Sequence, residues 1–321
     1  MMDQNTPLLE VKNLKKYFKV GQGGELHAVD DVSFSIEKGE TIGVVGESGC
    51  GKSSLGRTVL RLNEPTGGEI LYRGQNLVTM SSREMKKIRP KMQMIFQDPY
   101  SSLNGRMNVR QLIAEPLIVN KICKNRREMD ERIDHIMDIV GLASRLDMAY
   151  PHELDGGRRQ RIGIARTLVL EPEFVVCDEP VSALDVSIQA QILNLLMDLQ
   201  EELGLTYLFI THDLSVVRHI SRRIMVMYLG KCVEIADAQQ IFDNPLHPYT
   251  KALLSAIPIP SIESLHKHRE LLQGEVTSPV NPKPGCRFAA RCPHASPTCL
   301  QGDISMLEVE PGHFTACTLY Q

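Results

Sequence analysis

The stretch of sequence that decides the fold is Gly46-Glu47-Ser48-Gly49-Cys50-Gly51-Lys52-Ser53. It matches the phosphate-binding pattern G-x-x-x-x-G-K-[ST] at every fixed position. Glycines let successive backbone N–H groups turn toward one anion, and the N-terminus of a following helix adds partial positive charge. The stretch therefore predicts a site for nucleotide phosphates, in which Lys52 reaches the outer phosphates and Ser53 holds Mg²⁺.

The residues on either side of this loop have the pattern that such a site needs. Residues 41–45 are a short apolar run that predicts a buried strand, and residues 54–62 predict a helix after the loop. Apolar runs at 92–96, 174–177 and 206–210 predict further buried strands of a parallel sheet. Together they indicate a three-layer α/β core.

Stretches of other character lie between and after these strands. Apolar residues at helical spacing from 188 to 203 predict a helix that Gly204 ends, and residues about 98–160 predict a helical insert. Prolines become frequent from about residue 240. We therefore predict a nucleotide-binding domain over residues 1–240 and a small irregular C-terminal domain over residues 241–321.

Polar residues with catalytic potential come directly after the predicted strands. They are Gln97, Asp178, Glu179 and His212. Ligands of parallel sheets collect at the carboxyl ends of strands, so Asp178 is interpreted as part of the Mg²⁺ shell and Glu179 as the group that polarises the attacking water. His212 is interpreted as a contact to the γ-phosphate, and Gln97 as a contact to the water or to Mg²⁺. Each alone is more often structural; their combination with the phosphate loop favours catalysis.

The composition limits the partners and the location. Lys and Arg number 36 against 39 Asp and Glu, and the net charge of −3 gives no electrostatic case for binding nucleic acid. No apolar run approaches the roughly 18 residues that span a bilayer, and the N-terminal residues lack the features of a signal peptide. We therefore expect a cytosolic protein that reaches a membrane only through partners.

In this order, the motifs resemble those of the ATP-binding-cassette (ABC) ATPases. Ser182-Ala183-Leu184-Asp185 is similar to the D-loop of that family, and Leu154–Arg161 occupies the place of its signature, normally Leu-Ser-Gly-Gly-Gln. The resemblance implies an ABC-ATPase core with an antiparallel β subdomain, which binds ATP and Mg²⁺ through Gly46–Ser54 and Asp178. It also implies that Tyr17 stacks on adenine, the alternative being a packed strand residue.

The signature departs from the family pattern at two positions. In the family, each ATP lies between the phosphate loop of one subunit and the signature of the other. Asp155 replaces a Ser that would donate to the γ-phosphate, so a carboxylate would face phosphate. Arg158 replaces Gln and would partly offset that charge, while Gly156 and Gly157 are retained. The resemblance therefore implies an asymmetric heterodimer with one competent and one weakened site. The alternative is that the helix N-terminus and the two glycines suffice.

Further stretches narrow the resemblance to importers of dipeptides and oligopeptides, closest to the F-type dipeptide ATPase subunit. They are residues 97–104, 179–187, 247–254 and 285–293. This implies a second ABC ATPase, two transmembrane permeases and an extracellular or periplasmic substrate-binding protein as partners, at the cytoplasmic face of the membrane. Importers of nickel or metallophores belong to the same branch and are an alternative. A non-transport ABC ATPase and a cassette that binds ATP without hydrolysing it are also compatible with these motifs.

Four of the eight cysteines, Cys286, Cys292, Cys299 and Cys317, lie in the last 36 residues. The five, six and seventeen residues between them fit neither the C-x₂-C of common zinc modules nor a ferredoxin run. Four thiolates suit either a [4Fe–4S] cluster or Zn²⁺, and free thiols in a small core are the third alternative. The resemblance implies the [4Fe–4S] cluster.

Overall fold

The computed structural model describes residues 6–21, 23–256 and 277–321 of the chain. Over these residues the fold is the expected mixed α/β one, in which parallel strands alternate with helices and an antiparallel sheet and a helical region are added. No helix in this part of the chain is both long enough and apolar enough to cross a bilayer.

The chain divides into two compact units. The first is built from residues 1–37, 41–78 and 209–321, and the second from residues 38–40 and 79–208. The domain boundary expected near residue 240 does not coincide with this division and stays a prediction.

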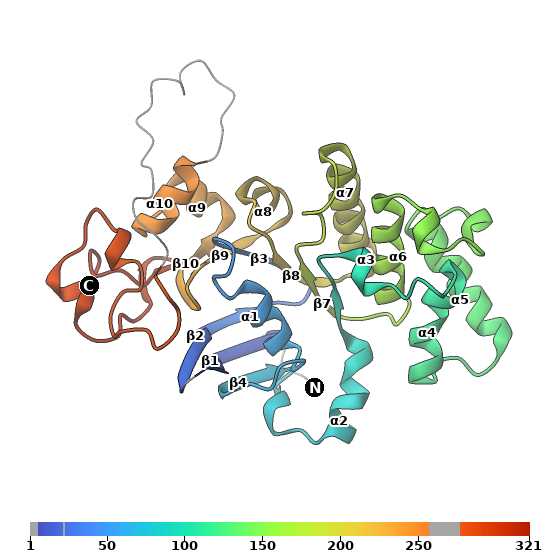
Figure 1. Ribbon diagram of the computed structural model, residues 1–321, viewed down its shortest axis with the longest axis horizontal. Helices are drawn as coiled ribbons and strands as arrows, with labels where there is room; N and C mark the ends of the chain where they lie inside the picture. Colours follow the sequence, from blue (N-terminus) through green and yellow to red (C-terminus); the bar gives the residue numbers. More distant parts are fainter. Residues whose placement is uncertain (1–5, 22, 257–276) are drawn as a thin grey trace, which may run out of the picture. The chain divides into compact units, whose positions relative to one another are not determined.

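An antiparallel sheet with the strand order β2-β1-β4-β5 lies in the first unit. Its strands are β1 (Leu9–Val20), β2 (Gly24–Ile36), β4 (Gly67–Tyr72) and β5 (Gln75–Asn76). Figure 1 shows β1, β2 and β4 side by side, and helix α1 (Lys52–Val59) contacts β1 and β2. This is the antiparallel β subdomain that the resemblance implied.

The first unit also contains strands in the order β11-β12-β10-β9-β3. They are β3 (Thr41–Val45), β9 (Arg223–Tyr228), β10 (Lys231–Asp237), β11 (Leu307–Glu310) and β12 (His313–Thr315). β3 and β9 are parallel, and the other pairs are antiparallel. All five residues of β3 are buried, which explains its uninterrupted apolar sequence. In the described residues after 209, the α-helices are α8 (Leu214–Ile220), α9 (Ala238–Asp243) and α10 (Pro248–Ser255).

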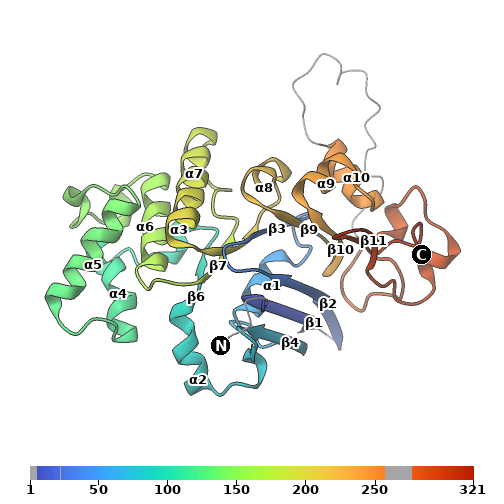
Figure 2. The ribbon, with the colours of Figure 1, turned by 180° about the vertical axis from the view of Figure 1, so that it is seen from behind.

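In the second unit, β6 (Met92–Ile95) pairs in parallel with β7 (Phe174–Asp178). The helices of this unit are α2 (Ser82–Ile88), α3 (Pro99–Ser102), α4 (Val109–Asn120), α5 (Arg126–Ile139), α6 (Gly156–Leu168) and α7 (Val186–Leu203). Figure 2 shows α4, α5 and α6 lying together as the predicted helical region. Strand β8 (Thr206–Ile210) is divided between the units after residue 208.

The element bounds follow the sequence pattern closely around the predicted site. The strands predicted at 41–45 and 206–210 coincide with β3 and β8. Helix α7 ends where Gly204 takes a left-handed φ of 63°, as predicted. Helix α1 begins at Lys52, two residues earlier than predicted, because Gly51 serves as its N-cap with a φ of 103°.

A buried acidic side chain joins the C-terminal residues to β10. The Glu234 carboxylate accepts hydrogen bonds from the backbone N–H groups of Leu246 at 2.7 Å and His247 at 2.9 Å. It also lies 2.7 Å from Nε2 of His313 in β12, and both side chains are completely buried. Because a buried carboxylate is costly without partners, this contact set holds the start of α10 and β12 against β10.

His247 makes the stability of the first unit depend on pH. Its Nδ1 accepts a hydrogen bond from the Tyr249 N–H at 3.0 Å and so caps α10. Burial lowers the pKa of His247 from 6.5 to about 4. As the pH falls, the unfolded chain therefore binds a proton before the folded chain does. The stabilisation is complete above pH 6.5 and is lost between pH 6.5 and 4.

We expect His247→Asn to remove this pH dependence, since Asn retains a side-chain oxygen for the helix cap. The difference in unfolding free energy between the wild-type protein and the variant should shrink by about 3 kcal/mol from pH 7 to pH 4. Urea unfolding followed by circular dichroism measures it. A difference that stays constant over this range would contradict the prediction.

Candidate active site

The phosphate loop connects β3 to α1. At two of its positions only glycine fits, because neighbouring backbone atoms leave no room for a side chain. A β-carbon on Gly46 would stand 2.2 Å from the Met227 carbonyl oxygen, and one on Gly51 would stand 2.0 Å from that of Ala28. Both glycines also have positive φ. The loop backbone is therefore pressed against β2 and the end of β9, and no other residue type fits at these two positions.

Lys52 is held inside the loop. The residue is only 4% exposed, and its Nζ donates to the carbonyl oxygens of Gly46 at 2.8 Å and Glu47 at 3.0 Å. Of the neighbouring predicted ATP contacts, Ser48 and Gly49 are exposed, and Ser53 and Ser54 are half-buried at the start of α1. The positive end of α1 and the Lys52 ammonium thus lie together, which is the arrangement that binds phosphate.

The Cys50 side chain is shielded from solvent, and its thiol is poorly reactive. It is buried, and burial raises the pKa of its thiol. Its carbonyl oxygen accepts a hydrogen bond from the Gly230 N–H at 2.7 Å. Cys50 therefore helps to pack the loop. The predicted contact of Cys50 to ATP is left to its backbone N–H group and stays a prediction.

Two predicted catalytic residues meet in the second unit. Asp178 ends β7 and is buried, and Glu179 follows it with a left-handed φ of 47°. The Gln97 side-chain amide donates to the Glu179 carboxylate at 2.9 Å across 82 positions of sequence. A non-glycine residue with positive φ is strained, and such strain clusters at functional sites. The bond orients the Glu179 carboxylate.

The remaining predicted catalytic residue belongs to the first unit. His212 is exposed and follows β8, just before α8, whose N-cap is Asp213. The first unit thus contains the phosphate loop and His212, and the second contains Gln97, Asp178 and Glu179. The predicted Mg²⁺ ligands are divided in the same way, so the catalytic assignments stay predictions.

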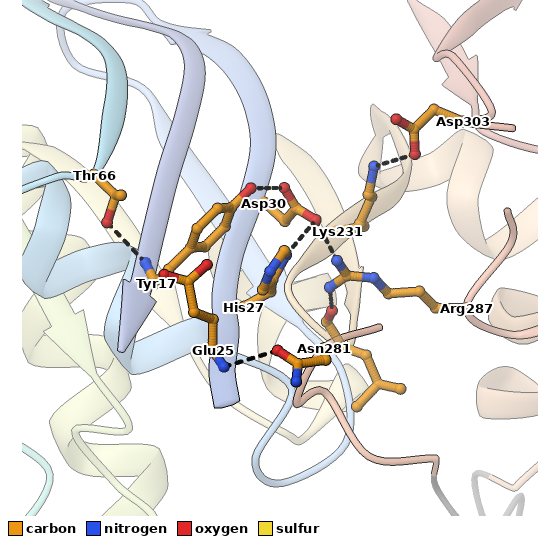
Figure 3. Close-up of polar contacts among 10 residues, drawn as sticks. Tyr17, Glu25, His27, Asp30, Thr66, Lys231, Asn281, Arg287 and Asp303 are labelled. Atoms are coloured by element: carbon orange, nitrogen blue, oxygen red, sulfur yellow. Dashed lines mark hydrogen bonds and ion pairs between the residues drawn. The ribbon is translucent and has the colours of Figure 1, made fainter. Parts of the chain in front are cut away.

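Tyr17 in β1 is the centre of a polar network that sequence patterns did not reveal (Figure 3). Its hydroxyl donates to Asp30 at 2.5 Å, and its ring stacks on His27 with centroids 3.8 Å apart and planes at 17°. His27 Nδ1 lies 3.2 Å from Asp30, and Arg287 forms an ion pair with the same carboxylate. One face of the predicted adenine platform is therefore covered by His27.

Neighbouring groups in this network shift the pKa values of Tyr17 and Asp30. Burial and the Asp30 hydrogen bond raise the pKa of Tyr17, which stays protonated as a donor. Burial alone would raise the pKa of Asp30, but hydrogen bonds from Tyr17 and His27 and the charge of Arg287 lower it. Tyr17 and His27 are direct partners across β1 and β2. An antiparallel register was thus the one signal that could have identified His27 from sequence.

Asp155 of the substituted signature is the N-cap of α6. Its Oδ1 accepts a hydrogen bond from the Arg158 N–H at 2.8 Å, and the Arg158 guanidinium lies 3.4 Å from the other carboxylate oxygen. A β-carbon on Gly157 would stand 2.8 Å from the Ile188 side chain, so this glycine permits close packing. Asp caps a helix as well as Ser does, and the substitution therefore keeps the fold while it adds a charge.

The four C-terminal cysteines do not form a metal site in this structure. Burial raises the pKa of Cys286 to about 11 and also raises that of Cys292 and Cys317. Burial acts in the same direction on Cys299, but hydrogen bonds from Ser296 and Thr318 outweigh it and lower its pKa. Among the described residues, no group of three or more His, Cys, Asp or Glu side chains is placed to hold a metal ion. The structure therefore gives the cluster and the zinc assignments no support, and both stay predictions.

Comparison with known proteins finds relatives along the whole chain. Residues 29–182 match the family described as "ABC transporter", and residues 233–299 match "Oligopeptide/dipeptide transporter, C-terminal region". A putative oligopeptide transport ATP-binding protein, YkfD of Bacillus subtilis, is 54% identical and covers 98% of this chain and 96% of its own. The dipeptide transport ATP-binding protein DppF of Haemophilus influenzae is 50% identical, and the match covers 98% of this chain and 97% of DppF.

Solved structures of similar fold are ATP-binding cassettes. The cassette MJ0796, determined as a dimer in a post-hydrolysis state with ADP and Pi, is 29% identical with a TM-score of 0.66 and covers 72% of this chain and 98% of its own. CbiO1 of Clostridium perfringens, part of the transporter complex CbiONQ, is 27% identical with a TM-score of 0.66. The match covers 74% of this chain and 91% of CbiO1.

Proposed function

The chain belongs to the ABC transporter family and is one of its ATPases, and from this premise we propose that it drives the uptake of di- and oligopeptides through partner permeases. The observation that carries the peptide class is the match of residues 233–299 to the oligopeptide/dipeptide transporter C-terminal region. Relatives that match almost the full length are named as ATP-binding proteins of oligopeptide or dipeptide transport, which supports the same class.

The chemistry follows from the two sets of residues. The N-terminus of α1 and Lys52 hold the ATP phosphates, and Glu179 polarises the attacking water with its carboxylate held by Gln97. His212 contacts the γ-phosphate. Ser53, Gln97 and Asp178 are the residues that would hold Mg²⁺, which would supply positive charge to neutralise the phosphates.

The second unit offers a surface for a permease. Ile118, Val119 and Met148 are each more than half exposed, and they line a cavity of about 620 Å³ beside α4 and α5. Exposed apolar side chains grouped in this way mark an interaction site. We place the permease contact here. The proposed complex has this chain and a second ATPase at the cytoplasmic face of the membrane, two permeases, and an extracellular or periplasmic substrate-binding protein.

The signature supports unequal ATP sites in a heterodimer. Asp155 is 59% exposed beside Arg158, so its carboxylate is available to a nucleotide carried by a partner subunit and is only partly neutralised. A carboxylate near the γ-phosphate weakens binding there by charge repulsion. The competent site is then the one that uses the phosphate loop and Glu179 of this chain.

Glu179→Gln should leave ATP binding intact and lower ATP turnover by about 100-fold or more, because the general base is removed from the competent site. The assay uses the complete complex with its permeases and measures phosphate release and peptide uptake. Lys52→Ala should lose both ATP turnover and ATP binding. The matched control is Glu201→Gln on the exposed face of α7. Turnover unchanged by Glu179→Gln would show that this site is silent.

Asp155→Ser should raise ATP turnover in the assembled complex several-fold, since it removes the repelling charge and retains the cap of α6. The control is Asp155→Ala, which also removes the charge but loses the cap and about 1 kcal/mol of stability. Thermal unfolding of both variants separates the two effects. Turnover that does not change with Asp155→Ser would count against the asymmetry.

The [4Fe–4S] cluster stays a proposal that rests on four cysteines within residues 286–317, with zinc as the alternative. Anaerobically purified protein should then contain about four iron atoms per chain and absorb visible light. One zinc per chain would support the alternative. Colourless protein without either metal would agree with the arrangement of the thiols described above and would reject both.

A further inference from the structure

A short C-terminal segment, residues 285–292, makes an ion pair with the phosphate loop. The Arg291 guanidinium donates to both carboxylate oxygens of Glu47, at 2.8 and 3.1 Å. The Arg291 side chain is 7% exposed and that of Glu47 is 25% exposed. A bidentate pair that is largely shielded from water fixes the geometry of both side chains, whereas an exposed salt bridge contributes little. Residue 47 of the loop is therefore held by residue 291.

Glu47 is also held through its backbone. Its N–H donates to the Tyr249 hydroxyl at 2.9 Å, and Tyr249 is completely buried. Tyr249 packs edge-on against Tyr228, which in turn packs edge-on against Phe288 of the same segment. Because the Glu47 carbonyl also accepts from the Lys52 ammonium, a single residue links Lys52 to the C-terminal contacts.

The same segment reaches the other end of the predicted ATP site. Arg287 donates to the Leu229 carbonyl and to the Asp30 carboxylate, which accepts from the Tyr17 hydroxyl (Figure 3). The Arg287 side chain is almost fully buried. The Tyr17 ring, predicted to stack on adenine, is thereby fixed through one carboxylate to a C-terminal arginine.

Backbone contacts attach this part of the chain to the strand that carries His27. The His27 N–H donates to the Pro279 carbonyl at 3.1 Å, and the Asn281 N–H donates to the Glu25 carbonyl at 2.8 Å. The Asn281 side chain returns a hydrogen bond by accepting from the Glu25 N–H at 2.8 Å. The approach of residues 279–287 to β2 is thus held by main-chain bonds.

We propose that the 285–292 segment positions the ATP site of its own chain, with Arg291 acting through Glu47 at the phosphate end and Arg287 acting through Asp30 and Tyr17 at the base end. The inference rests on the proposed ATP chemistry. Without Arg291, the Glu47 carboxylate of the phosphate loop would have no compensating charge and would repel bound phosphates. Without Arg287, the ring of Tyr17 would have to be ordered by the nucleotide at a cost in affinity.

The test measures the ATP dissociation constant of the purified full-length chain with Mg²⁺, by displacement of a fluorescent ATP analogue. Arg291→Ala should weaken ATP binding about tenfold. Arg291→Lys keeps the charge but loses the bidentate geometry. Its ATP dissociation constant should lie between those of the wild type and Arg291→Ala. The double variant Glu47→Ala/Arg291→Ala should recover most of the loss, because the repelling carboxylate is also gone. Lys283→Ala, which removes an exposed positive charge nearby, is the control and should bind as wild type.

Displacement by tripolyphosphate separates the two ends of the site. Arg287→Ala should weaken ATP but leave tripolyphosphate unchanged, since only ATP uses the Tyr17 ring. Arg291→Ala should weaken both. Equal losses for the two ligands in Arg287→Ala would overturn the assignment of Arg287 to the base end.

Failure of the inference and failure of the ATP chemistry give different results. If the wild-type chain does not bind ATP, or binds it equally well with Lys52→Ala, the proposed function itself falls. If the wild type binds ATP and Arg291→Ala binds it equally well, the positioning role is overturned. A loss in Arg291→Ala that the Glu47→Ala double variant does not reduce, together with a lowered Tm in both, would show a purely structural contact and would also overturn it.

Discussion

The phosphate loop is confined by two close approaches of its backbone to neighbouring carbonyl groups, at Gly46 and at Gly51. A side chain at either position would collide with the Met227 or the Ala28 carbonyl, so the loop adopts this shape only with glycine at both positions. In that shape α1 begins at Lys52, and the Lys52 ammonium is held by two carbonyls of the loop. Amide groups bind phosphate well only when the backbone presents them together before the ligand arrives. The ATP chemistry of the chain therefore depends on this steric constraint.

The C-terminal residues contribute to the same constraint, although they are distant from the loop in sequence. The family matches treat residues 29–182 and 233–299 as separate regions, yet the loop and the C-terminal residues belong to one compact unit. Glu47 is held by Tyr249 through its peptide group and by Arg291 through its side chain. A region that distinguishes the peptide branch of the family is thus in direct contact with its most general feature.

Asp155 departs from the family pattern at a position where the fold needs only a helix cap. As the N-cap of α6 it accepts the hydrogen bond that a serine would accept. Its negative charge is favourable at a helix N-terminus within its own chain. In the heterodimer proposed above, the same charge would be unfavourable toward the phosphates of a nucleotide carried by the partner subunit. Under that proposal, stability and nucleotide binding place opposite demands on this position, and Arg158, 3.4 Å from the Asp155 carboxylate, relieves only part of the conflict.

The amino-acid sequence by itself determined the strands at 41–45 and 206–210, the end of α7 at Gly204 and the phosphate loop. These features depend on local periodicity, on glycine conformation and on fixed motif spacing, all of which are written along the chain. The hydrogen bond from Gln97 to Glu179 joins residues 82 positions apart, and the ion pair from Arg291 to Glu47 joins residues 244 positions apart. Only the tertiary structure decided such contacts, because strand order, cross-strand register and the return of the C-terminus to the loop are set by packing, which no local pattern encodes.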